Sequence, residues 1–371
     1  MIPERILLEM AKPIIHHRTK SFEKVIEQVR VGLKTVFQTK NEVVMHASVG
    51  SGGMESAITN CFSPGEKIIV VRSGKFGERW SEQGKVYGLK VIDFDVEWGK
   101  AVSLQKMSEI LALHKDAKGF LCQACETSTG VSHPVEAMGK LLASTLPNCL
   151  VIIDAITALG ISDIKTDAWN LDIVVTGSQK AFMLPPGLSM VSFSDKALRA
   201  SDSAKLPRYY FDIRPEILAL KKNQTHFTPA ISLIQGLNVA LQMMQEEGLP
   251  NLFARHQRLA EATREACLEI GLQLFARENP SDSITAVLAP PSVNGDDVVR
   301  TLQDKYNFTI IGGQDQLKGK IFRLGHMGYC GDFDVISMVA ALEMSLKDLG
   351  HKFELGGGVA RATKVLHESF S

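Results

Sequence analysis

The 371-residue sequence has no surplus of either charge, since 41 Lys and Arg residues balance 41 Asp and Glu residues to a formal net charge of +0. Binding to the phosphates of nucleic acid needs a basic surplus, and so does a polybasic attachment to a membrane surface. The sequence also lacks any run that approaches the ~20 apolar residues of a membrane-spanning helix. We therefore expect neither nucleic acid nor a membrane among its partners.

Cysteine is also scarce, and its six residues are scattered through the chain, which fits a reduced cytoplasmic compartment better than a disulfide framework. Residues 1–20 lack a basic segment followed by an apolar one, so a secretory signal is not evident. We therefore expect a cytoplasmic protein. Cys122 and Cys125 have CxxC spacing, but a structural zinc site needs a second pair, and no other cysteines have matching spacing. We predict no metal site.

What the sequence does have is an alternation of strand-like and helix-like segments. Apolar, β-branched runs of strand length are separated by segments with helical spacing, such as 53–61 and 76–86. This alternation predicts an α/β fold with a mostly parallel sheet that helices cover on both faces. The predicted strands of this region are 42–45, 67–71, 90–94, 119–122, 150–153, 173–176 and 188–193.

The pattern changes toward the C-terminal end. A polar stretch over 208–223 precedes a long predicted helix over 229–247. The remainder is typical of a compact α+β unit, so we predict two domains, residues 1–250 and residues 251–371. Within the second domain the predicted elements are a first helix over 252–270, strands near 286–288, 309–311 and 320–324, and a last helix over 333–348.

Three positions in the first domain carry candidate chemistry. The glycine-rich residues 49–55, between a predicted strand and a helix, form a plausible phosphate cradle, although such a turn is purely structural at least as often. Asp154 closes an apolar strand, where a carboxylate needs a cation or a ligand unless it caps the next helix. Lys180 follows a buried strand, where its pKa can fall enough for it to act as an amine nucleophile, whereas most lysines are merely solvated.

In this order and spacing the three motifs are more specific together than apart, and the chain resembles the fold-type I pyridoxal-phosphate (PLP) enzymes. Within that group it is similar to the class V aminotransferases of the alanine–glyoxylate, serine–pyruvate and serine–glyoxylate type, over about residues 1–346. The resemblance implies a large domain with a mostly parallel, seven-stranded sheet between helices and a smaller C-terminal α+β domain. The motifs that carry it are HASVGSGGME (46–55), GKFGER (74–79), ETSTG (126–130), IIDAITALG (152–160), GSQKA (177–181), FTPAISL (227–233) and RLGHMG (323–328).

The resemblance also implies roles around the cofactor ring. Lys180 would form the Schiff base with PLP and then move the substrate proton between Cα and C4′. Asp154 would keep the pyridine nitrogen protonated, so that the ring accepts electrons. Phe76 would stack on one face of the ring, at a position that is often Trp in relatives, and Ile156 would pack on the opposite face. Thr127 would hydrogen-bond the edge of the ring that carries the hydroxyl.

The same resemblance implies how phosphate and substrate are held. Gly50, Ser51, Gly52 and Gln179 would bind the phosphate, and Thr228 would reach it from the neighbouring subunit of a homodimer. Arg323 would grip the α-carboxylate of the substrate as a bidentate fork, which lysine cannot copy. The implied reaction is a ping-pong transfer of an amino group from a small amino acid, alanine or serine, to a 2-oxo acid, glyoxylate or pyruvate.

Two alternatives and one departure stay open. A related PLP enzyme, such as a cysteine desulfurase, a lyase or a kynureninase-like hydrolase, would share the fold, although desulfurases usually have His before the lysine where this chain has Gln179. A non-catalytic PLP-binding or regulatory protein is the other alternative. Family members usually carry a GlyProThrPro-like segment before the residues that match 2–4, whereas this chain begins at Met1. A mis-assigned start codon, a truncated chain and a pocket built differently would each explain that departure.

Overall fold

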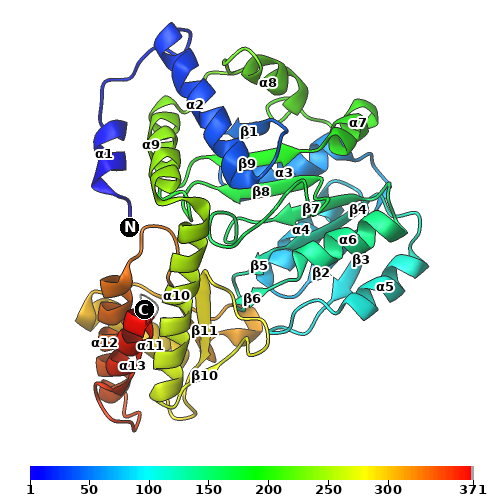
Figure 1. The fold of residues 1–371 in the computed structure, drawn as a ribbon. Coiled ribbons are helices and arrows are strands. Elements are labelled where there is room, and N and C mark those ends of the chain that lie inside the picture. Colours follow the sequence, from blue (N-terminus) through cyan, green and yellow to red (C-terminus); the bar gives the residue numbers. More distant parts are fainter. Residues whose placement is uncertain (369–371) are drawn as a thin grey trace.

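The central feature of the fold is a large, mostly parallel sheet, seen in a computed structural model that describes residues 1–368 (Figure 1). Within these residues the sheet has seven strands in the order β1-β9-β8-β7-β4-β2-β3. Neighbouring strands from β8 to β3 are parallel, whereas β9 runs antiparallel to both β8 and β1. The α/β fold with a mostly parallel sheet is thereby confirmed. The strands are β1 Val43–His46, β2 Lys67–Arg72, β3 Lys90–Asp95, β4 Gly119–Gln123, β7 Leu150–Asp154, β8 Ile173–Gly177 and β9 Ser189–Phe193.

Burial explains why these short apolar runs form the middle of the sheet. Every residue of β4, β7, β8 and β9 is buried, as expected for strands covered on both faces. Helix α3 packs on β8 and β9, and α4 packs on β2, β3 and β4, while α2 and α9 lie side by side next to the β1 edge (Figure 1). The helices around this sheet are α1 Glu4–Met10, α2 Lys20–Phe37, α3 Gly50–Cys61, α4 Lys75–Val86, α5 Leu104–Leu113, α6 Val135–Thr145, α7 Asp195–Ser203, α8 Ile213–Leu220 and α9 Ile231–Glu247.

The C-terminal part forms a second layer around a small antiparallel sheet of order β10-β11-β13-β12, flanked by α10 to α13 (Figure 1). The boundary predicted at residue 250 falls in the first turn of α10, and the division into two domains stays a prediction. The elements are α10 Leu249–Glu269, β10 Gln273–Leu274, β11 Ile284–Leu288, α11 Gly295–Tyr306, β12 Ile311–Gly312, the 3-10 helix η1 Asp315–Leu317, β13 Ile321–Gly325, α12 Asp332–Asp348 and α13 Gly357–Glu368. A two-stranded ribbon, β5 Cys125–Glu126 and β6 Val131–Ser132, lies between β4 and β7 in sequence and at the junction of the two sheets in Figure 1.

Two parts of the chain differ from the sequence-based prediction. The stretch 208–223 contains helix α8, because Asp212 caps it by accepting from the N–H of Arg214 and its apolar residues Ile213, Ile217 and Leu220 are buried. The helix over 332–348 is not the last one, since α13 follows and packs against α10 and α12. Among residues 1–368, no helix combines the length and the apolar character needed to cross a membrane.

Candidate active site

The carboxyl ends of two neighbouring strands bring Asp154 and Lys180 to the same edge of the central sheet. Asp154 is the last residue of β7 and pairs with Val175 of β8, and Lys180 follows the end of β8 at Gly177. Asp154 is only 5% exposed, and its Oδ1 accepts a hydrogen bond of 2.9 Å from the N–H of Ile156. Lys180 is half-buried, and its Nζ makes no hydrogen bond or ion pair with any residue in 1–368.

Burial shifts the protonation of both groups toward the neutral form. It raises the pKa of Asp154 from the usual 3.8 to about 7, and the nearby Glu126 carboxylate adds to this effect. Burial likewise lowers the pKa of the Lys180 amine, against the attraction of Asp154. A neutral lysine amine is a nucleophile, and a buried carboxyl group of this kind is stabilised when a cation binds against it.

The first turn of α3 has the properties of an anion cradle. Its N-terminal residue is Gly50, the preceding Val49 provides no side-chain cap, and the N–H groups of Gly50 and Ser51 have no partner among residues 1–368. The guanidinium of Arg79 lies beside it, with Nη1 donating to Ser51 Oγ at 3.0 Å. Free N–H groups at a helix start, next to a cation, favour a phosphate or carboxylate.

Gln179 joins the same cradle. A Cβ placed on Gly177 would lie 2.8 Å from Gln179 Oε1 and 3.6 Å from the backbone nitrogen of Gly50, so the Gln179 side chain lies near the start of α3. Gln179 Oε1 is buried and has no hydrogen-bond partner among residues 1–368. Gly52, by contrast, uses its N–H to bond the carbonyl of Val49 inside the first turn of the helix.

The side chains predicted around a ring also come together here. A Cβ on Gly50 would lie 2.2 Å from Ile156 Cδ1, which places the Ile156 side chain against the cradle. Thr127 is buried, and its Oγ1 shares a hydrogen bond of 2.7 Å with Thr157 Oγ1. The N–H of Phe76 in turn donates to a carboxylate oxygen of Glu126, the residue before Thr127, at 3.3 Å.

Arg323 enters from the small sheet, on β13, and is held in a fixed orientation. Its Nε and Nη2 donate to the carbonyl of Gly312 at 3.1 and 2.9 Å, and its Nη1 donates to the carbonyl of Thr127 at 3.0 Å. Of the five N–H groups of the guanidinium, one on Nη1 remains without a partner, and the second on Nη2 donates to Gln314 Oε1 at a long 3.5 Å. A carboxylate that replaced Gln314 Oε1 would meet one N–H from each Nη nitrogen, the arrangement with which arginine recognises carboxylates.

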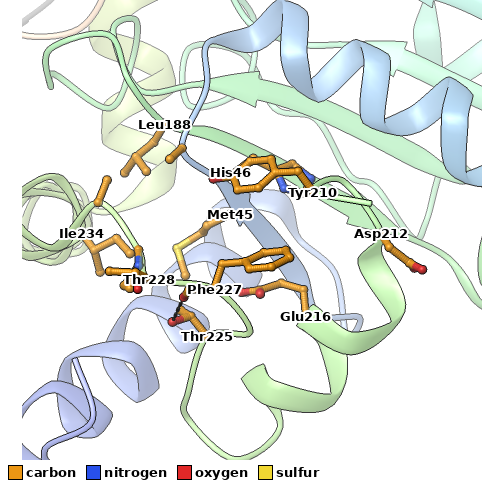
Figure 2. Close-up of a pocket in the computed structure, with 13 residues that line it drawn as sticks. Met45, His46, Leu188, Tyr210, Asp212, Glu216, Thr225, Phe227, Thr228 and Ile234 are labelled. Atoms are coloured by element: carbon orange, nitrogen blue, oxygen red, sulfur yellow. Dashed lines mark hydrogen bonds between the residues drawn. The ribbon is translucent and has the colours of Figure 1, made fainter. Parts of the chain in front are cut away.

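Thr228 is the predicted site residue that the fold of one chain leaves apart. It is exposed, and it lines a separate pocket beside β1 and α8, together with His46, Glu216 and Phe227 (Figure 2). In that pocket Thr225 Oγ1 donates to the carbonyl of Phe227 at 2.8 Å. The residues that line it include neither the predicted lysine nor the predicted carboxylate-binding arginine.

Three polar residues of the cluster were not predicted as site residues: Arg79, Glu126 and Thr157. Trp80, the residue after Arg79, is fully buried, whereas Arg79 donates to Ser51 at the cradle. Arg79 stands three residues after Phe76, hence on the same helix face, and its Cζ lies 5.0 Å from the centre of the Phe76 ring. That spacing was the signal available in the sequence.

The two cysteines with CxxC spacing lie inside the fold. Cys122 and Cys125 are both buried, and burial raises the pKa of each thiol. Cys125 Sγ donates to Ser281 Oγ at 3.0 Å. Among residues 1–368, no group of three or more His, Cys, Asp and Glu side chains is placed to hold a metal ion.

Comparison with known proteins agrees with this geometry. The family model "Aminotransferase class-V" matches residues 9–327. A soluble hydrogenase small subunit from Synechococcus sp. is 40% identical over 369 residues, covering 98% of this chain and 96% of that protein. An L-aspartate–glyoxylate aminotransferase from Paracoccus denitrificans is 38% identical over 366 residues, covering 97% and 92%. The solved ureidoglycine–glyoxylate aminotransferase from Bacillus subtilis has a TM-score of 0.94 at 25% identity, covering 99% of this chain and 95% of that one.

The fold and the clustered side chains define a fold-type I PLP aminotransferase. Because the family match spans most of its length, this chain belongs to the class-V aminotransferase family. The predicted family, fold class and enzyme class are thereby confirmed. The roles of individual residues, the substrates and the subunit arrangement stay predictions.

Proposed function

We propose that this chain binds PLP at the Asp154–Lys180 site and transfers an amino group from a small amino acid, alanine or serine, to glyoxylate or pyruvate. The observation that carries the proposal is that Asp154, Lys180 and the cradle at Gly50 lie at one edge of the central sheet. The residues fit the cofactor. The free N–H groups of α3 suit its phosphate, and the buried Asp154 suits its protonated ring nitrogen.

When bound, PLP supplies an aldehyde that condenses with amines and a ring that accepts electrons from the substrate Cα. The chain's own residues do the rest. Asp154 holds the proton on the ring nitrogen, and Phe76 and Ile156 cover the two ring faces. With PLP bound, Lys180 Nζ would move the substrate proton between Cα and C4′, general acid–base catalysis that typically supplies ~10²–10⁴-fold.

Arg323 selects the substrate in this proposal. The free N–H of Nη1 and the N–H of Nη2 that is weakly bonded to Gln314 bind the α-carboxylate, which both an amino acid and a 2-oxo acid carry, so one residue serves both halves of a ping-pong reaction. A dicarboxylate would need a second cation. The neighbouring Arg79 is bound to Ser51 at the cradle, and Lys75 pairs with Asp315 at 3.0 Å. This arrangement supports a small monocarboxylate donor.

We also propose a homodimer in which Thr228 of one subunit completes the phosphate site of the other. Its support is that Thr228 is exposed and lies in a separate pocket (Figure 2).

The test is a set of half-reactions. The purified, PLP-loaded protein is mixed with single amino acids, and formation of pyridoxamine phosphate is followed by its absorbance. We expect alanine or serine to react fastest, and glyoxylate or pyruvate to restore the starting spectrum. A faster reaction with aspartate would overturn the donor, and no reaction with any amino acid would overturn the function. Oxidation of H₂ with a dye acceptor tests the activity that the name of the Synechococcus relative implies.

A further inference from the structure

Glu126 is a fully buried carboxylate that no other part of the proposed function explains. Its Oε1 accepts from the N–H of Phe76 at 3.3 Å, from the N–H of Ser128 at 3.1 Å and from Ser128 Oγ at 2.5 Å. Its Oε2 accepts from the N–H of Gly77 at 3.0 Å. Burial raises the pKa of Glu126, while these four hydrogen bonds oppose the rise.

Two of the four donors belong to the first turn of α4, which starts at Lys75. The residue that precedes this helix is Gly74, which has no side chain to cap it. Glu126 supplies the missing cap from a segment about fifty residues later in the chain, and the positive end of the helix dipole favours its negative charge. A Cβ on Gly74 would lie 2.5 Å from Glu126 Cδ, so glycine at this position makes room for the carboxylate.

The segment around Glu126 joins the two sides of the active site. Its carboxylate holds the turn that carries Phe76, and from the same helix Arg79 reaches Ser51 of the cradle. The next residue, Thr127, accepts a hydrogen bond from Arg323 through its carbonyl. A shift of Glu126 would therefore move the residues proposed to face the cofactor ring and phosphate.

We propose that Glu126 is a positioning residue, whose carboxylate fixes the first turn of α4 so that Phe76 stands against the cofactor ring and Arg79 reaches the phosphate cradle. The inference rests on the proposed function, because it needs a cofactor between Phe76 and Ile156. Glu126 itself touches neither the cofactor nor the substrate in this arrangement.

The substitution Glu126→Gln tests it. An amide replaces one acceptor oxygen by a donor, so at least one backbone N–H of the turn faces another N–H group. The chain offers a matched control in Glu343, which is also buried and caps α13 by accepting from the N–H groups of Gly356 and Val359. Glu343→Gln makes the same chemical change in the C-terminal layer, away from the site.

Three quantities are compared for the two variants: PLP affinity, the visible circular dichroism of the bound cofactor, and kcat. Losing a hydrogen bond to a charged group typically corresponds to a factor of roughly 10 or more. We expect Glu126→Gln to weaken PLP affinity and to lower kcat by about that factor, and to change the dichroism. Glu343→Gln should lower the melting temperature but leave all three quantities at their wild-type values.

A double-mutant cycle shows whether the effect passes through Phe76. In a Phe76→Leu background, Glu126→Gln should cost less PLP affinity than it does in the wild type, because the ring it positions is gone. If Glu126→Gln does not fold, Ser128→Ala replaces it, since that variant removes one donor to the carboxylate and the acceptor for the Lys75 N–H.

The outcomes separate the two proposals. If the wild type binds PLP and reacts with amino acids, but Glu126→Gln or its Ser128→Ala substitute leaves affinity, dichroism and kcat unchanged, the positioning role is wrong and the function stands. The positioning role is also contradicted if Glu126→Gln lowers PLP affinity by the same factor in the wild type and in the Phe76→Leu background. If the wild type itself binds no PLP, the proposed function is wrong, and the role of Glu126 is wrong with it.

Discussion

The charges of Asp154 and Lys180 each act against the pKa shift that burial causes in the other residue. Burial raises the pKa of the Asp154 carboxyl group to about 7, and the lysine charge pulls it down. Burial lowers the pKa of the Lys180 amine, and the aspartate charge pulls it up. The Asp154 carboxyl group therefore changes its protonation near neutral pH, and the Lys180 amine gives up its proton more readily than an exposed lysine does, which suits groups in acid–base catalysis.

The raised pKa of Asp154 predicts a pH-dependent stability of the cofactor-free protein. A carboxyl group that holds its proton more tightly when folded stabilises the fold fully below its unfolded pKa, and this contribution is lost as the pH rises toward 7. Asp154→Asn does not titrate. The free energy of unfolding of the wild type should therefore fall relative to that of the variant between about pH 4 and 7, by at most ~1.4 kcal/mol per pH unit.

Chemical denaturation of both cofactor-free proteins at several pH values measures this difference. Saturating PLP should reduce the pH slope, because a protonated ring nitrogen gives the Asp154 carboxylate a cationic partner. The same substitution should lower turnover strongly in the loaded enzyme. If the difference in free energy of unfolding between the wild type and Asp154→Asn did not change over this pH range, the Asp154 carboxyl group would not have a raised pKa in the folded protein.

The unpartnered amine of Lys180 leads to a prediction about the absorption spectrum. Its Nζ has no partner among residues 1–368 and lies near Asp154 and Arg323, so it is available to bond covalently to PLP. Lys180→Ala should remove the visible absorption band of lysine-bound PLP and nearly all turnover. Lys180→Arg serves as the control that keeps the positive charge without the nucleophilic amine. An unchanged spectrum in Lys180→Ala would show that another amine binds the cofactor.

Arg323→Lys should separate substrate binding from folding. Lysine cannot present two parallel N–H groups, so we expect KM for the amino acid to rise by roughly 10- to 100-fold, with cofactor binding retained. Arg208→Lys is the matched control, because the Arg208 guanidinium is also buried and donates to the backbone carbonyls of Thr59, Ser201 and Ala204. Steady-state kinetics and melting temperatures of both variants give the answer. If Arg323→Lys had the same KM for the amino acid as the wild type, Arg323 would not bind the substrate carboxylate.

The sequence located the side chains that stand on strand ends and in compact motifs. Asp154 ends one apolar strand and Lys180 follows the next, and parallel neighbouring strands have their carboxyl ends at the same edge of the sheet. The apolar runs in the sequence were therefore enough to predict that the two residues lie at one edge. Glu126 could not be found in this way, because its function depends on a backbone turn about fifty residues earlier. The helix α8 was missed because its three buried apolar residues lie within a polar stretch.

Thr228 shows a second limit. A residue that acts in another subunit leaves no trace in the contacts of its own chain, so neither the sequence pattern nor the fold of one chain places it in the site. Its exposure and its distance in sequence from Lys180 are what one expects of a residue that contributes across an interface, and only an experiment on mixed subunits can assign it.

Mixing two inactive variants provides that experiment. Lys180→Ala lacks the amine, and Thr228→Ala is expected to lose PLP affinity, so each is assayed at a PLP concentration too low to load Thr228→Ala. If Thr228 acts across the interface, a mixed dimer has one doubly defective site and one intact site, because the intact lysine and the intact threonine come from different subunits. Equal mixing makes about half of the dimers mixed, so activity should return to about a quarter of the wild-type value. If Thr228 acts within its own chain, every mixed site carries one defect and no activity returns.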